Sequence, residues 1–234
     1  MSMTVSIPTQ QLRQRAAAFA LLARMLGPDV TALVDGDTLA ALRRTLDDAG
    51  DIATIQRLAD LESVLPADAS DLTGAWVRWF DLGRVAAYEG SNVPATAGGI
   101  TPRLADIAGF YTAFGVTVSK ERPDHLVAEL EFMSILLLSD ADARSDGNVE
   151  RSEIAADAAR AFLRDHLGTW VTAWASRVGD IDELAPWFPV AAAAAELVRA
   201  ECRDRHVIPL RLSPVLPADT GLAPPEEKML QCGD

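Results

Sequence analysis

Apolar residues recur every three to four positions along most of the chain, which is the period of an α-helix with one buried face. In the first such segment the repeating positions are Leu12, Ala16, Phe19, Ala23 and Leu26. Similar patterns cover about residues 37–65, 71–83, 101–115, 123–139, 149–178 and 187–204. Strand-like alternation does not stand out. The pattern predicts an all-α fold consisting of a single globular helical domain.

Glycine and proline divide these helical patterns. Gly50 interrupts residues 37–65, so that segment predicts one or two helices. Thr101 is a candidate N-cap with Pro102 at the first helical position, and Pro123 opens the next helix. The polar run at residues 140–150 predicts a break. We expect a helical domain over residues 1–208 and a proline-rich, extended or mobile tail over residues 209–234.

The amino-acid composition and net charge limit which kinds of partner the protein can bind. Hydrophobic residues make up 49% of 234 residues, which is enough for a sizeable core. The net charge of −13 argues against nucleic acid and against anionic membranes, and it favours a cationic or protein partner. Cys202 and Cys232 do not make a disulfide framework, which is typical of a reducing compartment. With Arg24 interrupting the first apolar run, we read an amphipathic helix rather than a signal peptide, and expect a cytoplasmic protein without stable membrane insertion.

The stretch ERPDHLVAELEF, at residues 121–132, combines a polar helix start with an apolar continuation. On a helical wheel Leu126 and Leu130 share one face, and Asp124, His125 and Glu129 share the other. We therefore expect the polar turn at a rim above the core. A hydrogen bond between His125 and Glu129 would raise the affinity of the histidine for a proton. Two interpretations stay open, a capped helix start that forms a recognition rim and an acid–base pair.

Other candidate chemistry is sparse. Cys202 and His206 are four residues apart and could bind zinc together with His125 or His166. His166 is flanked by apolar residues, which favours a structural histidine. Phosphate-binding loops and hydrolase motifs are missing from the sequence. We expect no enzyme activity, no catalytic residues and no cofactor. The long connection at residues 88–101 is either a functional loop or a simple linker.

Three segments together resemble a known family. LADIAGFYTAFG at residues 104–115, ERPDHLVAELEFM after it, and AFLRDHLGTWVTAW further on are similar to motifs of the TorD/DmsD/NarJ family of molybdoenzyme maturation chaperones. The sequence of the central motif is most similar to that of chaperones in the branch that serves ethylbenzene, dimethyl sulfide, chlorate and selenate enzymes. The resemblance implies an all-helical cytoplasmic chaperone that binds the apo catalytic subunit of a dimethyl sulfoxide reductase-class enzyme, often through its N-terminal or twin-arginine segment, until the molybdenum cofactor is inserted.

The resemblance also implies a client-binding site. It carries the family's recognition residues over to Tyr88, Glu89, Glu121, Pro123, Asp124 and His125. We expect the acidic residues and His125 to orient a polar or basic client segment, and Tyr88 and Phe110 to receive apolar side chains, unless Phe110 simply packs in the core. The alternatives are a small metal-dependent enzyme using Cys202 and His206, and a scaffold subunit retained in a mature complex. We expect a monomer or a dimer.

Overall fold

The computed structural model describes residues 7–66, 69–94, 99–118 and 122–211, and these residues form helices joined by short connections. The all-α prediction is confirmed. The longer helices are α1 (Thr9–Leu26), α3 (Gly36–Asp48), α8 (Thr101–Ala113), α9 (Leu126–Ser145), α10 (Val149–Asp165), α11 (Leu167–Gly179) and α12 (Phe188–Asp204). The shorter elements are α2 (Thr31–Val34), α4 (Ile52–Arg57), α5 (Leu61–Val64), α6 (Ser70–Trp76), the π-helix η1 (Val77–Asp81), α7 (Glu89–Asn92) and the 3-10 helix η2 (Asp182–Leu184).

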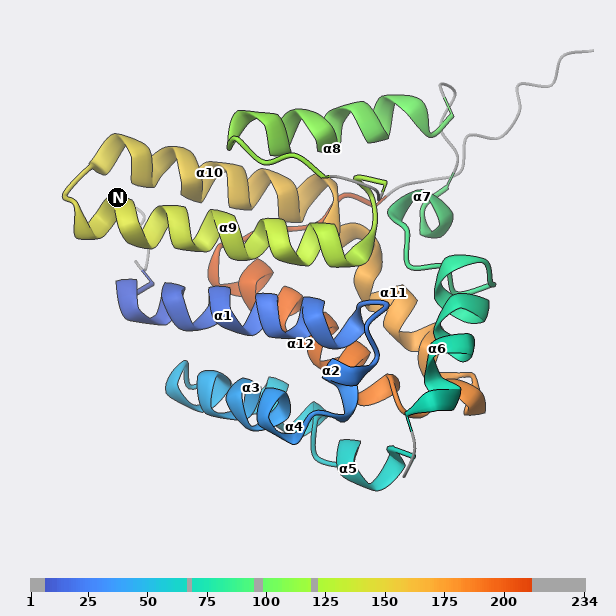
Figure 1. Ribbon diagram of the computed structural model, residues 1–234. Coiled ribbons are helices and arrows are strands. Elements are labelled where there is room, and N and C mark those ends of the chain that lie inside the picture. Colours follow the sequence, from blue (N-terminus) through green and yellow to red (C-terminus); the bar gives the residue numbers. More distant parts are fainter. Residues whose placement is uncertain (1–6, 67–68, 95–98, 119–121, 212–234) are drawn as a thin grey trace, which may run out of the picture.

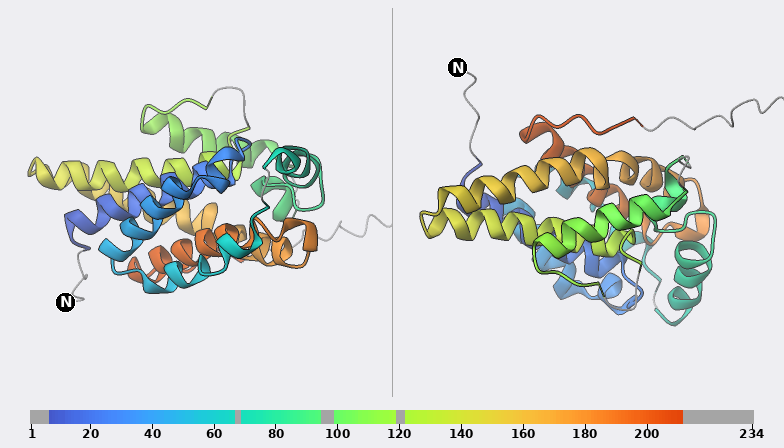
Figure 2. Two further views of the ribbon diagram at one scale, coloured as in Figure 1. Left: turned by 60° about the horizontal axis from the view of Figure 1, so that its bottom comes forward. Right: turned by 90° about the horizontal axis from the view of Figure 1, so that it is seen from above.

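Helix α9 lies at the centre of the helical layers (Figure 1). It packs against α1 on one side and against α10 on the other, while α8 covers the outer side of the α9–α10 pair (Figure 2). Helices α3 and α12 pack against α1, and α4 and α11 pack against α12. The short helices α6 and α7 stand together at one end of the layers. None of the described helices is both long and apolar enough to cross a bilayer.

The central position of α9 follows from its sequence. Its predicted apolar face, which includes Leu126 and Leu130, is buried. Phe132 and Leu136 lie on other sides of the helix and are buried as well. A helix that is apolar nearly all round is stable in water only when other helices cover it nearly all round.

The predicted bounds of α9 were wrong at both ends. It begins at Leu126, with His125 as its N-cap, rather than at Pro123. It continues to Ser145 through part of the expected polar break, because Asp140 and Arg144, one turn apart, pair at 2.7 Å on the helix. Ser152 of α10 also donates a hydrogen bond to Asp140 at 2.6 Å. Since these polar residues satisfy one another, the turn shortens to residues 146–148.

Other boundaries differ in smaller ways. Residues 37–65 contain three helices instead of one or two, and Gly50 separates the first two with a positive φ of 72°. The pattern over residues 149–178 divides at His166. Thr101 is the first residue of α8 and not its cap. Pro209, Leu210 and Arg211 follow the helical layers, the rest of the proline-rich tail lies outside the described residues, and a domain boundary near residue 208 stays a prediction.

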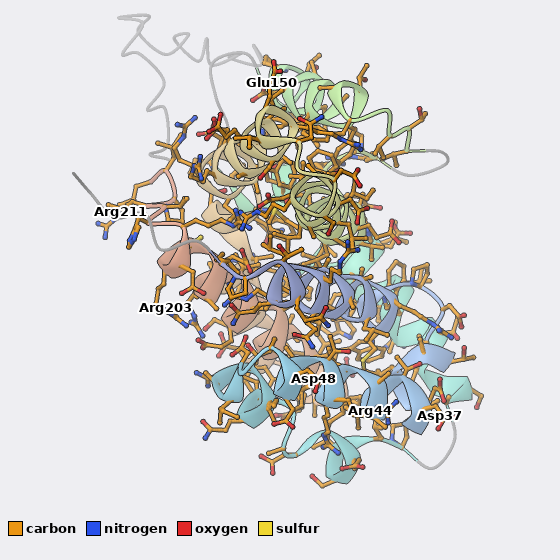
Figure 3. The ribbon with its side chains drawn as sticks, turned by 90° about the vertical axis from the view of Figure 1, so that its left-hand side faces the viewer. Asp37, Arg44, Asp48, Glu150, Arg203 and Arg211 are labelled. Atoms are coloured by element: carbon orange, nitrogen blue, oxygen red, sulfur yellow. The ribbon has the colours of Figure 1, made fainter. Side chains whose placement is uncertain are left out.

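Charged side chains project from the outer faces of the helices, as Figure 3 shows for Arg44 and Asp48 on α3 and for Glu150 at the start of α10. Arg15 differs from these residues because it is buried between α1 and α12. Its guanidinium group lies 3.0 Å from Glu201 and 2.5 Å from Asp204. Arg205 pairs with the other oxygen of Glu201 at 2.7 Å. This buried network joins the first and the last helix of the described chain.

The Arg15 network predicts a large difference between two neighbouring arginines of α1. Arg15→Ala should lower the free energy of unfolding by about 3–5 kcal/mol, because it leaves the buried Glu201 short of a partner. Arg13→Ala removes an exposed pair with Asp142 and should cost less than about 1 kcal/mol. Urea unfolding followed by circular dichroism measures both variants. Equal losses would show that the buried network does not hold the two helices together.

Candidate functional site

Two segments that are far apart in the sequence pair at the end of the molecule near α7. Tyr88 and His125 form an isolated antiparallel bridge. The Glu89 N–H donates to the Asp124 carbonyl at 2.8 Å, and the Leu126 N–H donates to the Ala87 carbonyl at 2.8 Å. The structure therefore brings together five of the residues expected to bind a client: Tyr88, Glu89, Pro123, Asp124 and His125. Glu121 lies outside the described residues.

Asp124 joins these two segments through its side chain. It is fully buried, and its Oδ2 accepts a hydrogen bond from the Gly90 N–H at 3.0 Å. Arg122 contacts both carboxylate oxygens, at 3.0 and 2.7 Å, and its guanidinium group also lies over the Tyr88 ring at 4.7 Å. The prediction of a polar rim is wrong for Asp124. Its carboxylate is buried, where it accepts hydrogen bonds from Gly90 and Arg122.

His125 is buried as well and caps α9. Its Nδ1 accepts a hydrogen bond from the Val127 N–H at 3.2 Å, and its ring packs 4.9 Å from the Tyr88 ring. Burial lowers the pKa of His125 to about 4, because the attraction of Asp124 and Asp81 offsets only part of the desolvation. The expected hydrogen bond to Glu129 is not formed, and the expected rise in proton affinity is wrong.

Glu129 lies inside the protein one turn further along α9. The Trp170 indole N–H donates to its Oε2 at 3.1 Å, and the residue has no exposed surface. Burial raises the pKa of Glu129 well above its usual value. Glu129 is thus a buried, hydrogen-bonded core residue rather than part of an acidic surface.

A second polar cluster lies on the other side of Glu89. The buried Glu89 carboxylate forms an ion pair with Arg103 of α8, and its Oε2 lies 3.2 Å from Nδ1 of His166. Asp106 lies 3.3 Å from Nε2 of the same histidine. His166 is buried and hydrogen-bonded, which confirms its structural interpretation, and burial lowers its pKa.

Sequence reasoning did not find Arg103 and Asp106, which both stand in the first two turns of α8. These residues border an open polar cavity of about 560 Å³, together with Pro102, Asp165, His166 and Leu210. The Arg103 guanidinium group is engaged in the ion pair with the buried Glu89 carboxylate. The cluster fixes the start of α7 against the junction of α10 and α11.

Phe110 belongs to the packing of the core. Its ring centroid lies 5.5 Å from that of Phe162 and 6.5 Å from that of Phe132, in edge-to-face arrangements. Tyr88 is almost completely buried, and its hydroxyl donates to Asp81 at 3.0 Å. Neither ring forms an open apolar receiving surface.

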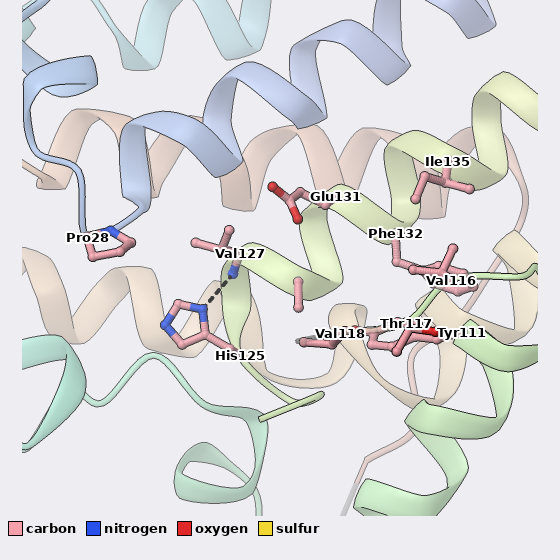
Figure 4. A pocket seen from close by; sticks show the side chains of 11 residues that line it. Pro28, Tyr111, Val116, Thr117, Val118, His125, Val127, Glu131, Phe132 and Ile135 are labelled. Carbon is pink, nitrogen blue, oxygen red and sulfur yellow. Dashed lines mark hydrogen bonds between the residues drawn. The ribbon is translucent and has the colours of Figure 1, made fainter. Parts of the chain in front are cut away.

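An apolar groove lies beside the paired segments, between α9 and the extended residues 116–118 (Figure 4). Its volume is about 270 Å³. His125 and Pro28 border one end, and the walls come from α9 and from the segment that follows α8. The lining residues are Pro28, Tyr111, Val116, Thr117, Val118, His125, Val127, Ala128, Glu131, Phe132 and Ile135. The groove offers a surface for apolar side chains but no activated nucleophile.

The residues considered for metal binding do not converge. Cys202 is buried in α12, and burial raises the pKa of its thiol to about 11. His206 lies beyond the end of that helix, with a positive φ of 54°. Within the described residues, no three His, Cys, Asp or Glu side chains are grouped so that they could hold a metal ion. The predicted zinc site at Cys202 and His206 therefore lacks a third ligand within the described residues.

The burial of Asp124 predicts a loss of stability rather than a simple loss of binding. Asp124→Ala should lower the free energy of unfolding by about 2 kcal/mol or more, because the Gly90 N–H loses its acceptor inside the protein. Glu62→Ala, which removes an exposed partner of Arg43, should cost less than about 1 kcal/mol. Urea unfolding compares the two variants with the wild type. A wild-type midpoint for Asp124→Ala would contradict this role.

The lowered pKa of His125 predicts that the free energy of unfolding decreases in mild acid. As the pH falls below about 6.5 the unfolded chain binds a proton at this residue, whereas the folded protein, with a pKa of about 4, does not. The stabilisation by the buried neutral ring is complete above pH 6.5 and is lost toward pH 4. Between pH 7 and pH 5 the loss from this residue should be about 2 kcal/mol.

Urea midpoints at pH 7 and pH 5 measure this effect. His125→Asn keeps an acceptor at the N-cap and should show a correspondingly smaller pH dependence. His206→Asn is the control, because that residue is exposed and asparagine tolerates its positive φ. An unchanged pH dependence in His125→Asn would contradict the assignment.

Comparison with known proteins identifies similar chains. Residues 46–176 match the family model described as "Nitrate reductase delta subunit". The selenate reductase assembly chaperone protein of Thauera selenatis is 34% identical over 159 residues, which is 64% of this chain and 79% of that protein. The chlorate reductase assembly chaperone protein of Ideonella dechloratans is 34% identical over 131 residues, which is 53% of this chain and 66% of that protein. The matched residues include both paired segments.

Proposed function

The chain belongs to the nitrate reductase delta subunit family, whose members include the TorD- and NarJ-type chaperones, and from that membership we propose that it is an assembly chaperone of a dimethyl sulfoxide reductase-class molybdoenzyme. The observation that carries this proposal is its similarity to two assembly chaperones, those of a selenate and a chlorate reductase. Both belong to the branch that the central motif resembles. Their names describe assembly of another protein and not a reaction.

The proposed client is the apo catalytic subunit, held through its N-terminal segment while the molybdenum cofactor is inserted. The acidic chain, with a net charge of −13, favours association with a basic segment. The groove beside His125 supplies apolar contact area, which must provide most of the affinity because exposed charge pairs add only about 0.2–1 kcal/mol each. Binding before export takes place in the cytoplasm, where this chain acts as a monomer or a dimer.

The proposed client-binding residues act mainly through the loops that they hold. Asp124 and Glu89 fix the two paired segments from inside, so they set the shape of the surface without contacting the client directly. Of the proposed residues, His125 borders the groove, and the Tyr88 ring packs against His125. Glu121, which lies outside the described residues, stays a predicted client-binding residue. This division of roles supports recognition by a preformed surface.

Co-expression tests the proposal. A candidate catalytic subunit is produced with and without this chain, its bound molybdenum is measured, and association is followed by affinity purification. We expect lower molybdenum content without the chain, and association with the apo subunit but not with the mature subunit.

Two outcomes would contradict the proposal. Retention of the chain in the mature, molybdenum-loaded enzyme would favour a scaffold subunit. Equal molybdenum content with and without the chain, across reductases of the selenate and chlorate type, would remove the assembly function.

A further inference from the structure

Three side chains of α9 face the groove at intervals of four residues: Val127, Glu131 and Ile135 (Figure 4). Four residues of an α-helix span about 6 Å along its axis, so these side chains form a row with the carboxylate between two apolar groups. Val127 and Ile135 are half-buried, whereas Glu131 is exposed. Val116 and Val118 form the opposite wall and pack against the core.

Glu131 lies in an unusual setting for an exposed acid. Among the described residues lining the groove it is the one that carries charge at neutral pH, because burial keeps His125 neutral and raises the pKa of Tyr111. Partial burial among apolar side chains also raises the pKa of Glu131. Among the described residues its carboxylate has no ion-pair or hydrogen-bond partner, unlike acids on the outer helix faces that pair with arginines, such as Asp157. A cation brought into the groove would compensate its charge.

The spacing of the row matches an extended peptide. Alternate side chains of a strand point the same way and lie about 6.6 Å apart, close to the 6 Å between successive positions of the row. The groove volume of about 270 Å³ is below the range typical of pockets for whole small molecules and suits a few side chains. An extended segment along α9 would therefore place one side chain at each of the three positions.

Building on the proposed function, we propose that this groove reads a client segment of the pattern apolar–any–basic–any–apolar, in extended conformation, with Glu131 pairing the central Lys or Arg. Val127 and Ile135 then contact the two apolar side chains, together with Val116 and Val118 from the opposite wall. The central charge selects the register of the peptide, since a shift by two residues would place an apolar side chain on the carboxylate and a shift by one would turn the basic side chain to the other face of the strand. Glu131 is thus a specificity-determining residue.

Three fluorescent peptides test the pattern on the full-length purified chain. The first contains Leu-Ser-Arg-Ser-Leu between polar flanks, the second has the same composition with the two leucines adjacent, and the third has Glu in place of Arg. Fluorescence anisotropy measures binding. The wild type should bind the first peptide about fivefold more tightly than the second, and about tenfold more tightly than the third.

Charge reversal provides the decisive variant. Glu131→Lys should bind the Glu peptide more tightly than the Arg peptide, which inverts the wild-type order. Glu153→Lys changes the net charge equally at an exposed position on α10 and should keep the wild-type order. Circular dichroism and the thermal midpoint establish that both variants fold, which is expected because both side chains are exposed.

The proposal is overturned if Glu131→Lys keeps the preference for the Arg peptide, or if the permuted peptide binds as tightly as the first. A wild-type dimer that Glu131→Lys dissociates, without peptide binding, would assign the groove to a second copy of the chain. These experiments use no client. A chain that supports molybdenum loading but does not distinguish the peptides would refute the groove proposal alone, and the reverse result would refute the assembly function alone.

Discussion

The buried carboxylate of Asp124 is the interaction on which the site depends. It holds a backbone N–H of α7 and a guanidinium group at once, and thereby fixes two loops that are separated by more than thirty residues. Desolvating a carboxylate is costly, so the charge is tolerated only because both of its oxygens have partners. The loops in turn place His125 at the start of α9 and at the edge of the groove.

Much of the fold could be predicted because the helical period appears in residues that are only three or four positions apart in the sequence. The face of α1 that includes Leu12 and Phe19 and the row from Leu163 to Trp174 are buried as the pattern predicts. Helix ends were predicted less well, since they depend on particular hydrogen bonds. Pro123 suits a first helical turn, yet His125 caps α9, and the acids after Ser139 continue the helix because Arg144 pairs with Asp140.

The sequence predicted which residues lie together at the site, but not that their side chains are buried. The family resemblance named Tyr88, Asp124 and His125, and the structure brings these residues together. The helical wheel predicted that the side chains of Asp124 and Glu129 are exposed, because a wheel contains only the neighbours within the same helix. Their partners, Gly90 and Trp170, come from segments 34 and 41 residues away. Whether a polar residue is buried depends on such distant partners, which local periodicity does not contain.

The packing of α1 between α9 and α12 also has a consequence for biosynthesis. The hydrogen bond from Arg15 to Glu201 spans 186 residues, so the first helix leaves the ribosome long before its partner exists. At about 5–20 residues per second, that interval is on the order of ten to forty seconds. The nascent chain must keep the apolar face of α1 out of aggregates during this time.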